Sequence, residues 1–215
     1  MITTIKKSAA YDNPFFQRCR SVTALTPDQL RPLARNWREV TRSFWLATCR
    51  LVGMLGDQAD TTLLPPLLKI AAEDAGLFGG AVDGRQGPPH YLLWQDLCDS
   101  LAVNWETEPE PETVALIQAF TQMNDVRTGL AMVIVVEAVA YEIIDATRSA
   151  FQAAGIVEQR PGYLTLHRSL EIEHARDMGE VAKLIDMDLT KECANFCGHW
   201  ANFWSAMHRV TFGKD

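Results

Sequence analysis

Hydrophobic residues recur every three or four positions between residues 25 and 57. The apolar positions of this stretch are Leu30, Leu33, Trp37, Val40, Phe44, Ala47 and Leu51. Because an α-helix turns once in about 3.6 residues, this spacing places them on one face of a long helix. Thr26 suits the N-cap and Pro27 the first helical position, so we expect the helix to begin there. The pattern predicts a long helix that buries one apolar stripe.

The same periodicity, punctuated by Gly and Pro, continues along the rest of the chain. The expected helices span residues 25–57, 61–76, 90–103, 108–125, 129–155, 163–187 and 190–212. The stretch 129–155 is nearly all apolar, so we expect it at the centre of the molecule. No internal repeat or linker interrupts the series. The sequence therefore predicts an all-α bundle formed by a single domain, residues 1–215.

Composition narrows the classes of partner. A chain of 215 residues, 47% of them hydrophobic, can bury one well-packed core. With 20 basic and 27 acidic residues, a net charge of −7 and no basic cluster, we expect no nucleic-acid partner. The longest apolar run, residues 130–141, contains an acid and is too short to span a bilayer. The chain opens without a signal-peptide pattern, and its five cysteines suggest no disulfide framework, so we expect a reducing, cytoplasmic setting and no membrane partner.

The stretch 163–180 carries the most specific chemical pattern. His167, Glu171 and His174 are spaced four and then three residues apart. Positions four and seven apart lie within about 40° of each other around a helix, so the three side chains share a face. Two imidazoles and a carboxylate are donors that iron, manganese and zinc accept. A solvated polar helix face would show a similar composition, so the neighbouring residues have to decide between the two interpretations.

Glu137 favours the metal interpretation, because apolar residues surround it in the stretch 132–140. An unpaired carboxylate in such a place would cost several kcal/mol to bury, so it needs a metal, an arginine or a proton. Glu73 and His90 lie on either side of the glycine-rich loop 77–89, and both can point inward at the same end of the bundle. Glu73 can equally be an exposed acid, and His90 a residue that caps its helix.

The order of these residues resembles a known family. An acid, a histidine, an acid and then His-x-x-x-acid-x-x-His is similar to the ligand pattern of the haem-oxygenase-like diiron oxidases and oxygenases. The stretches 13–20 and 30–51 also look like that family. Glu171 stands where the family usually has Asp, and the loop 77–89 is longer than usual.

The resemblance implies a seven-helix bundle without haem, in which two irons activate dioxygen as a co-substrate. The implied metal ligands are Glu73, His90, Glu137, His167, Glu171 and His174. The implied reaction is the oxidation of a small amine, amino acid or fatty acid, by N-oxygenation, oxidative carbon–carbon cleavage or desaturation. We expect a small-molecule substrate and a homodimer.

Two other functional classes fit a bundle of this kind. The first is a metal-independent enzyme similar to thiaminase II, with Cys98 or Cys193 as nucleophile, or to pyrroloquinoline-quinone synthase. The second is a noncatalytic bundle that binds a partner. Further candidates concern the substrate. The candidate carboxylate anchors are Arg148, Arg168 and Arg176. The aromatic residues of the last helix, which pack in the core or form a cavity wall, are Trp200, Phe203 and Trp204. The loop 77–89 is a lid or a connector.

Overall fold

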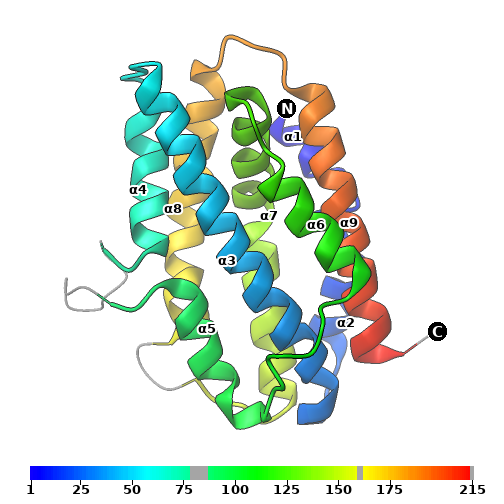
Figure 1. The fold of residues 1–215 in the computed structure, drawn as a ribbon. Coiled ribbons are helices and arrows are strands. Elements are labelled where there is room, and N and C mark those ends of the chain that lie inside the picture. The colour runs from blue at the N-terminus through cyan, green and yellow to red at the C-terminus, as the bar shows by residue number, and fades with distance from the viewer. Residues whose placement is uncertain (78–86, 159–161, 214–215) are drawn as a thin grey trace.

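A computed structural model describes residues 1–77, 87–158 and 162–213 of the chain. In these ranges the protein is built from nine α-helices and one short 3₁₀ helix, and it contains no strand (Figure 1). The helices are α1 (Ile2–Ile5), α2 (Pro14–Ser21), α3 (Pro27–Asp57), α4 (Leu64–Asp74), α5 (His90–Cys98), η1 (Asp99–Leu101), α6 (Pro111–Thr121), α7 (Val126–Ala153), α8 (Tyr163–Leu184) and α9 (Thr190–Phe212). The expected all-α class is confirmed. Residues 78–86 of the loop considered as a lid lie outside the described ranges.

The seven expected helices correspond to α3–α9, and the expected number of helices was too small by two. The short helices α1 and α2 precede them. The four residues of α1 are too few to show a helical period. In α2, Asn13 caps the first turn by accepting a hydrogen bond from the Phe15 backbone N–H at 3.0 Å. Phe15 and Phe16 are buried, so tertiary packing supplies most of the stability that a helix of eight residues lacks by itself.

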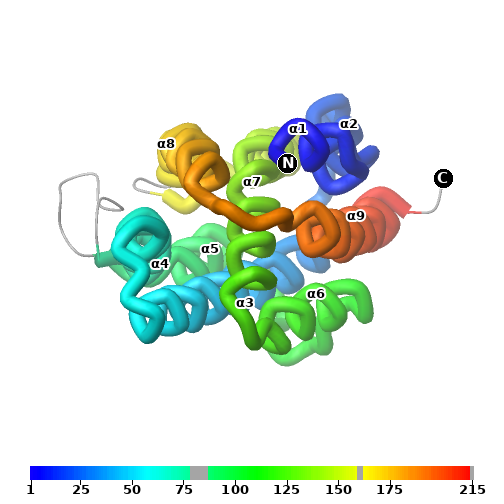
Figure 2. The backbone as a smooth tube through the Cα atoms, turned by 90° about the horizontal axis from the view of Figure 1, so that it is seen from above, coloured from blue at the N-terminus to red at the C-terminus, as the bar shows by residue number. Residues whose placement is uncertain are grey.

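The long helix α7 runs through the middle of the bundle, between α8 and α9 (Figure 2). It contacts α1, α2 and α3 as well. Its residues are buried almost without interruption from Gly129 to Val139, as the apolar sequence predicted. Gly129 has no side chain to hold α7 away from Met123 and Leu51, because a Cβ there would lie 2.6 Å from the Met123 sulfur. Any polar residue in this part of α7 is therefore deep in the core.

Helix α8 packs along α7, and α4 and α5 pack against α8 (Figure 1). The C-terminal end of α4 and the N-terminal end of α5 therefore meet the middle of α8. This arrangement brings four segments from distant parts of the sequence to one place in the core.

Aromatic side chains fill the other half of the interior. Trp37 of α3 lies 5.4 Å from Trp204 and 6.0 Å from Trp200, measured between ring centroids. Phe203 packs edge-on against Trp204 at 4.6 Å. All of these side chains are buried, so the aromatic residues of α9 belong to the core, and Trp200 also lines an internal cavity. Among the described helices, none combines the length and apolar character needed to cross a membrane.

A buried amide joins α3 to the start of α6. The Asn36 side chain donates to the Pro32 carbonyl at 2.7 Å. Its Oδ1 accepts from the Glu110 backbone N–H at 2.8 Å and from the Thr113 hydroxyl at 2.7 Å. Asn36 is fully buried, so its three hydrogen bonds replace water that cannot reach them.

We predict that Asn36→Ala lowers the free energy of unfolding by about 2–4 kcal/mol, because two buried donors lose their acceptor. Urea unfolding monitored by circular dichroism measures the change. The exposed Asn195 of α9 provides the control, since Asn195→Ala should change stability by less than about 0.5 kcal/mol. Equal effects of the two substitutions would contradict a structural role for Asn36.

Candidate metal centre

Two groups of candidate metal-ligating side chains line one cavity between α3, α4, α5, α7, α8 and α9. The first group is Asp74, His90 and His167, and the second is Glu137, Glu171 and His174. Within each group, one donor atom from every residue lies within 4.8 Å of the others. All six residues line the same cavity, which has a volume of about 50 Å³.

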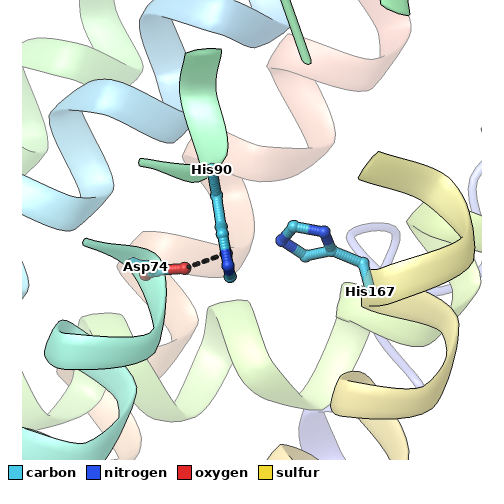
Figure 3. Close-up of side chains that lie close together, drawn as sticks. All are labelled: Asp74, His90 and His167. Carbon is cyan, nitrogen blue, oxygen red and sulfur yellow. Dashed lines mark hydrogen bonds and ion pairs between the residues drawn. The ribbon is translucent and has the colours of Figure 1, made fainter. Parts of the chain in front are cut away.

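In the first group, the Asp74 carboxylate holds His90. His90 Nδ1 lies 3.0 Å from Asp74 Oδ1, and the His167 ring lies edge-on to His90 at 4.5 Å between centroids (Figure 3). A carboxylate that accepts from one ring nitrogen fixes the tautomer and leaves the other nitrogen as a donor to a metal. His90 Nε2 is buried and has no hydrogen-bond partner among the described residues. His90 is therefore oriented as metal-ligating imidazoles commonly are.

A close backbone contact between Gly76 and Gly87 places Asp74 beside His90. Gly76 follows α4 with φ +77°, in the left-handed region that favours glycine. Its carbonyl accepts a hydrogen bond from the Gly87 N–H at 2.9 Å. A Cβ on Gly76 would lie 2.2 Å from the Gly87 carbonyl oxygen. This contact holds the end of α4 near the start of α5. Asp74 therefore lies beside His90, although the two are 16 residues apart in sequence.

His167 is held as a neutral imidazole. Its Nδ1 lies 2.9 Å from the Tyr163 carbonyl one turn earlier, so Nδ1 carries the proton and Nε2 keeps a free lone pair. The Tyr163 ring stacks on the imidazole with 3.9 Å between centroids, and the Tyr163 hydroxyl accepts a hydrogen bond from the Trp37 indole. Burial, and next the neighbouring His90, lower the pKa of His167 well below its ordinary value. A neutral imidazole is the form that binds a metal.

In the second group, carboxylates surround His174. Its Nδ1 lies 3.2 Å from Glu137 Oε2 and 3.7 Å from Glu171 Oε2. Its Nε2 lies 2.7 Å from Glu73 Oε2. Burial lowers the pKa of His174, but the three carboxylates outweigh burial and hold this pKa well above its ordinary value. The positive charge of a protonated His174 thus offsets part of the negative charge of the buried acids.

The acids of this group are costly to bury without a cation. Burial raises the pKa of Glu171 to about 7; the charge of Glu137 adds to the rise and His174 opposes it. Glu137 Oε2 and Glu171 Oε2 are buried and lack hydrogen-bond partners among the described residues. Nearly all buried polar atoms in proteins have hydrogen-bond partners. Two carboxylate oxygens and His90 Nε2 that lack such bonds and belong to residues of one cavity therefore fit the donor set of a metal centre.

Each residue expected from the sequence lies at this centre, but they do not play equivalent parts. His90, Glu137, His167, Glu171 and His174 line the cavity. Glu73 lies behind His174 and reaches the group only through that imidazole.

Asp74 was not among the site residues predicted from the sequence. The only signal for it was its position next to Glu73 at the end of a helix. Two neighbouring acids on α4 point to two different imidazoles, Glu73 to His174 and Asp74 to His90.

The candidate substrate anchors and nucleophiles lie elsewhere. Arg168 and Arg176 are exposed, Arg148 is half-buried, and none of the three lines the metal-centre cavity. Cys98 is buried outside that cavity, and burial raises its pKa well above the ordinary value. Burial also raises the pKa of Cys193 to about 11. Thiols with raised pKa values are poor nucleophiles, so neither cysteine has the environment of an activated one.

Outside the centre, Glu142 of α7 has a structural role. It accepts a hydrogen bond from the Tyr11 hydroxyl at 3.0 Å and pairs with Arg20 of α2. Five residues separate it from Glu137, which turns it to the opposite side of the helix.

Comparison with known proteins gives one family and a shared fold. A model of the family described as iron-containing redox enzymes matches residues 78–197. No curated protein matches the chain.

Among solved structures, a domain of unknown function with a haem-oxygenase-like fold from Shewanella denitrificans superposes with a TM-score of 0.71 at 15% identity, covering 100% of this chain and 93% of its own. A CADD-like protein of unknown function from Nostoc punctiforme superposes with a TM-score of 0.65 at 17% identity, covering 99% and 92%. At these identities the likeness shows the fold, and the expected haem-oxygenase-like architecture is confirmed.

We predict that Gly76→Ala destabilises the protein by about 1–3 kcal/mol, because alanine disfavours the left-handed conformation and its Cβ meets the Gly87 carbonyl. Gly179 of α8 is the control, since a Cβ there meets nothing within 4 Å, and Gly179→Ala in a helix should raise stability by about 0.5–1 kcal/mol. Urea unfolding of the two variants checks the opposite signs. A neutral or stabilising effect of Gly76→Ala would contradict the close backbone contact between Gly76 and Gly87.

Proposed function

The chain belongs to the family of iron-containing redox enzymes, and on that premise we propose that it is a non-haem diiron oxidase or oxygenase. In the proposed reaction, dioxygen is the co-substrate and a small amine, amino acid or fatty acid is oxidised. The product follows from N-oxygenation, oxidative carbon–carbon cleavage or desaturation. The region that matches the family contains His90, Glu137, His167, Glu171 and His174.

One observation carries the proposal: residues that line one cavity hold three buried atoms without a hydrogen bond, His90 Nε2, Glu137 Oε2 and Glu171 Oε2. The two carboxylate oxygens share one cationic neighbour, His174 Nδ1, at 3.2 and 3.7 Å. An unsatisfied buried polar group costs about 1–3 kcal/mol, and charged groups cost more. Cations bound on this cavity would satisfy all three atoms. Mixed imidazole and carboxylate donors suit iron and manganese, and the family favours iron.

We assign one iron to each group of donors. Asp74, His90 and His167 would hold the first, and Glu137, Glu171 and His174 the second. Glu73, expected from the sequence as a ligand, would serve as a positioning residue, because it does not line the cavity and its carboxylate contacts His174 Nε2.

The donor count supports oxygen chemistry over hydrolysis. Three protein donors for each metal leave coordination positions for dioxygen and substrate. A mononuclear zinc hydrolase needs a single set of three ligands and a water, so the second group would have no purpose in such an enzyme. Two bound ferrous ions would pass two electrons to dioxygen, the substrate or a reductant would supply the rest, and the chain supplies the donors and a water-poor surrounding.

The walls of the cavity provide that surrounding. Val136, Ala140, Ile143 and Ile144 of α7 lie along one side, and Phe44 of α3 contributes from another element. All five are buried. Apolar walls keep water from the reacting atoms and strengthen every electrostatic interaction inside.

The proposal extends to the setting of the enzyme. We propose a homodimer in the reducing cytoplasm, acting on a small molecule. The location is supported by the five cysteines, which are all free thiols in the described structure, four of them buried.

We predict that the protein reconstituted with ferrous iron under anaerobic conditions binds about two irons per chain. His90→Ala removes a donor of the first group and His174→Ala a donor of the second, so each should lower the content toward one iron. The double variant should retain almost none. Iron analysis after gel filtration measures the stoichiometry. His199→Ala, at a half-buried histidine away from the cavity, is the matched control. Unchanged iron content in the double variant would exclude the assigned sites.

We also predict that the ferrous protein consumes dioxygen faster than the same concentration of free ferrous iron. An oxygen electrode measures the rate. Glu137→Gln keeps the shape of the side chain but removes its charge, so it should lower the rate at least about tenfold, as changes around metal centres commonly do. Arg148→Ala, outside the cavity, should leave the rate unchanged. Oxygen uptake no faster than that of free iron would mean that the centre stores or binds metal without activating oxygen.

A further inference from the structure

The wall of the metal-centre cavity is uneven in exposure. Of its eighteen lining residues, fourteen are buried. The four half-buried ones are Thr41, Trp45, Asp74 and Tyr91.

These four residues come from one side of the cavity. Thr41 and Trp45 lie one turn apart on α3, Asp74 ends α4, and Tyr91 is the second residue of α5. The remaining walls, from α7, α8 and α9, are buried throughout. The shortest way from the donors to solvent therefore passes between α3, α4 and α5.

Two aromatic rings cover this way out. The Trp45 and Tyr91 rings stack with 6.0 Å between centroids and an interplanar angle of 25°. The Trp45 indole N–H donates to the Ala71 carbonyl of α4 at 3.2 Å, which ties the ring to the third helix of the rim. Tyr91 directly follows His90, so the ring at the rim and a donor of the first group share one turn of α5.

We propose that the Trp45–Tyr91 stack is the entrance of the cavity and selects the molecules that reach the metal centre. The pair is held by one offset stack and one hydrogen bond, both at the surface, whereas every other wall is fixed by core packing. Rotation of either ring would widen this entrance without moving a helix. The role in substrate selection rests on the proposed function, but the position of the entrance does not.

The walls behind the entrance narrow the class of substrate. Apolar side chains of α3 and α7 surround the approach, and the polar atoms gather at the donors. Within the described residues, no Lys or Arg lines the cavity. A slender molecule with an aliphatic body and one polar end fits this division, with the polar end at the metals.

Chemical labelling of the apo protein tests the entrance. Diethyl pyrocarbonate carbethoxylates neutral imidazoles, and peptide mapping reports each histidine separately. Trp45→Ala and Tyr91→Ala should each raise the labelling rates of His90 and His167 by roughly three- to tenfold, the factor that corresponds to losing an aromatic pair. The half-buried His199 and His208, which line no part of this cavity, are internal references whose rates should not change.

Matched variants separate opening from general loosening. Trp105 and Tyr141 are also half-buried aromatic residues, and neither lines the cavity. Trp105→Ala and Tyr141→Ala should leave the labelling of His90 and His167 at the wild-type rate. Equal labelling in wild type and both entrance variants, or equal acceleration in the control variants, would overturn the entrance.

A second measurement tests selection on the iron-loaded ferric protein. Stopped-flow absorbance follows the binding of azide and of hexanoate, a small ion and a slender aliphatic acid. Tyr91→Ala should speed hexanoate binding about threefold or more, as loss of the stack predicts, and leave azide binding unchanged. No faster hexanoate binding in the variant would overturn selection by the pair. Failure of wild type to bind azide at all would count against the proposed iron centre, while the labelling result would still decide the entrance.

Discussion

The burial of acidic side chains in an apolar core is the constraint on which the rest of this structure depends. Glu137 lies in the middle of α7, the most completely buried helix, and Glu171 faces it from α8. A carboxylate in such a place needs a positive charge. In the structure His174 provides it, held by Glu137, Glu171 and Glu73 together. This arrangement costs stability that a purely apolar core would not lose, which is the usual sign that a site serves chemistry.

The same constraint explains how the helices are placed. Six helices contribute to the cavity, and the donors come from α4, α5, α7 and α8. Two acids at the end of α4 each contact one imidazole through a carboxylate oxygen. Glu73 contacts His174 in this way, and Asp74 contacts His90. A carboxylate that accepts from a metal-binding imidazole fixes its tautomer and raises its basicity. The backbone contact between Gly76 and Gly87 places Asp74 of α4 beside His90.

Local periodicity explains which features the sequence could predict. The seven long helices and the shared face of His167, Glu171 and His174 follow from the 3.6-residue turn, which needs no knowledge of the fold. Glu137 was found because apolar neighbours mark a buried position. Asp74 could not be found in this way, because its contact with His90 depends on the backbone contact between Gly76 and Gly87 and not on a helical period. The helices α1 and α2 are too short to show a helical period. Whether Arg148, Arg168 and Arg176 face the cavity depended on which side of each helix packs against the core.

The most direct test of two irons on this cavity is anomalous diffraction at the iron absorption edge from crystals of ferrous-loaded protein. The account predicts two peaks in the anomalous map. One should lie among Asp74, His90 and His167, and the other among Glu137, Glu171 and His174, with the Glu73 carboxylate still on His174. A single peak, peaks on other residues, or an iron-loaded protein with no peak at these groups would contradict it.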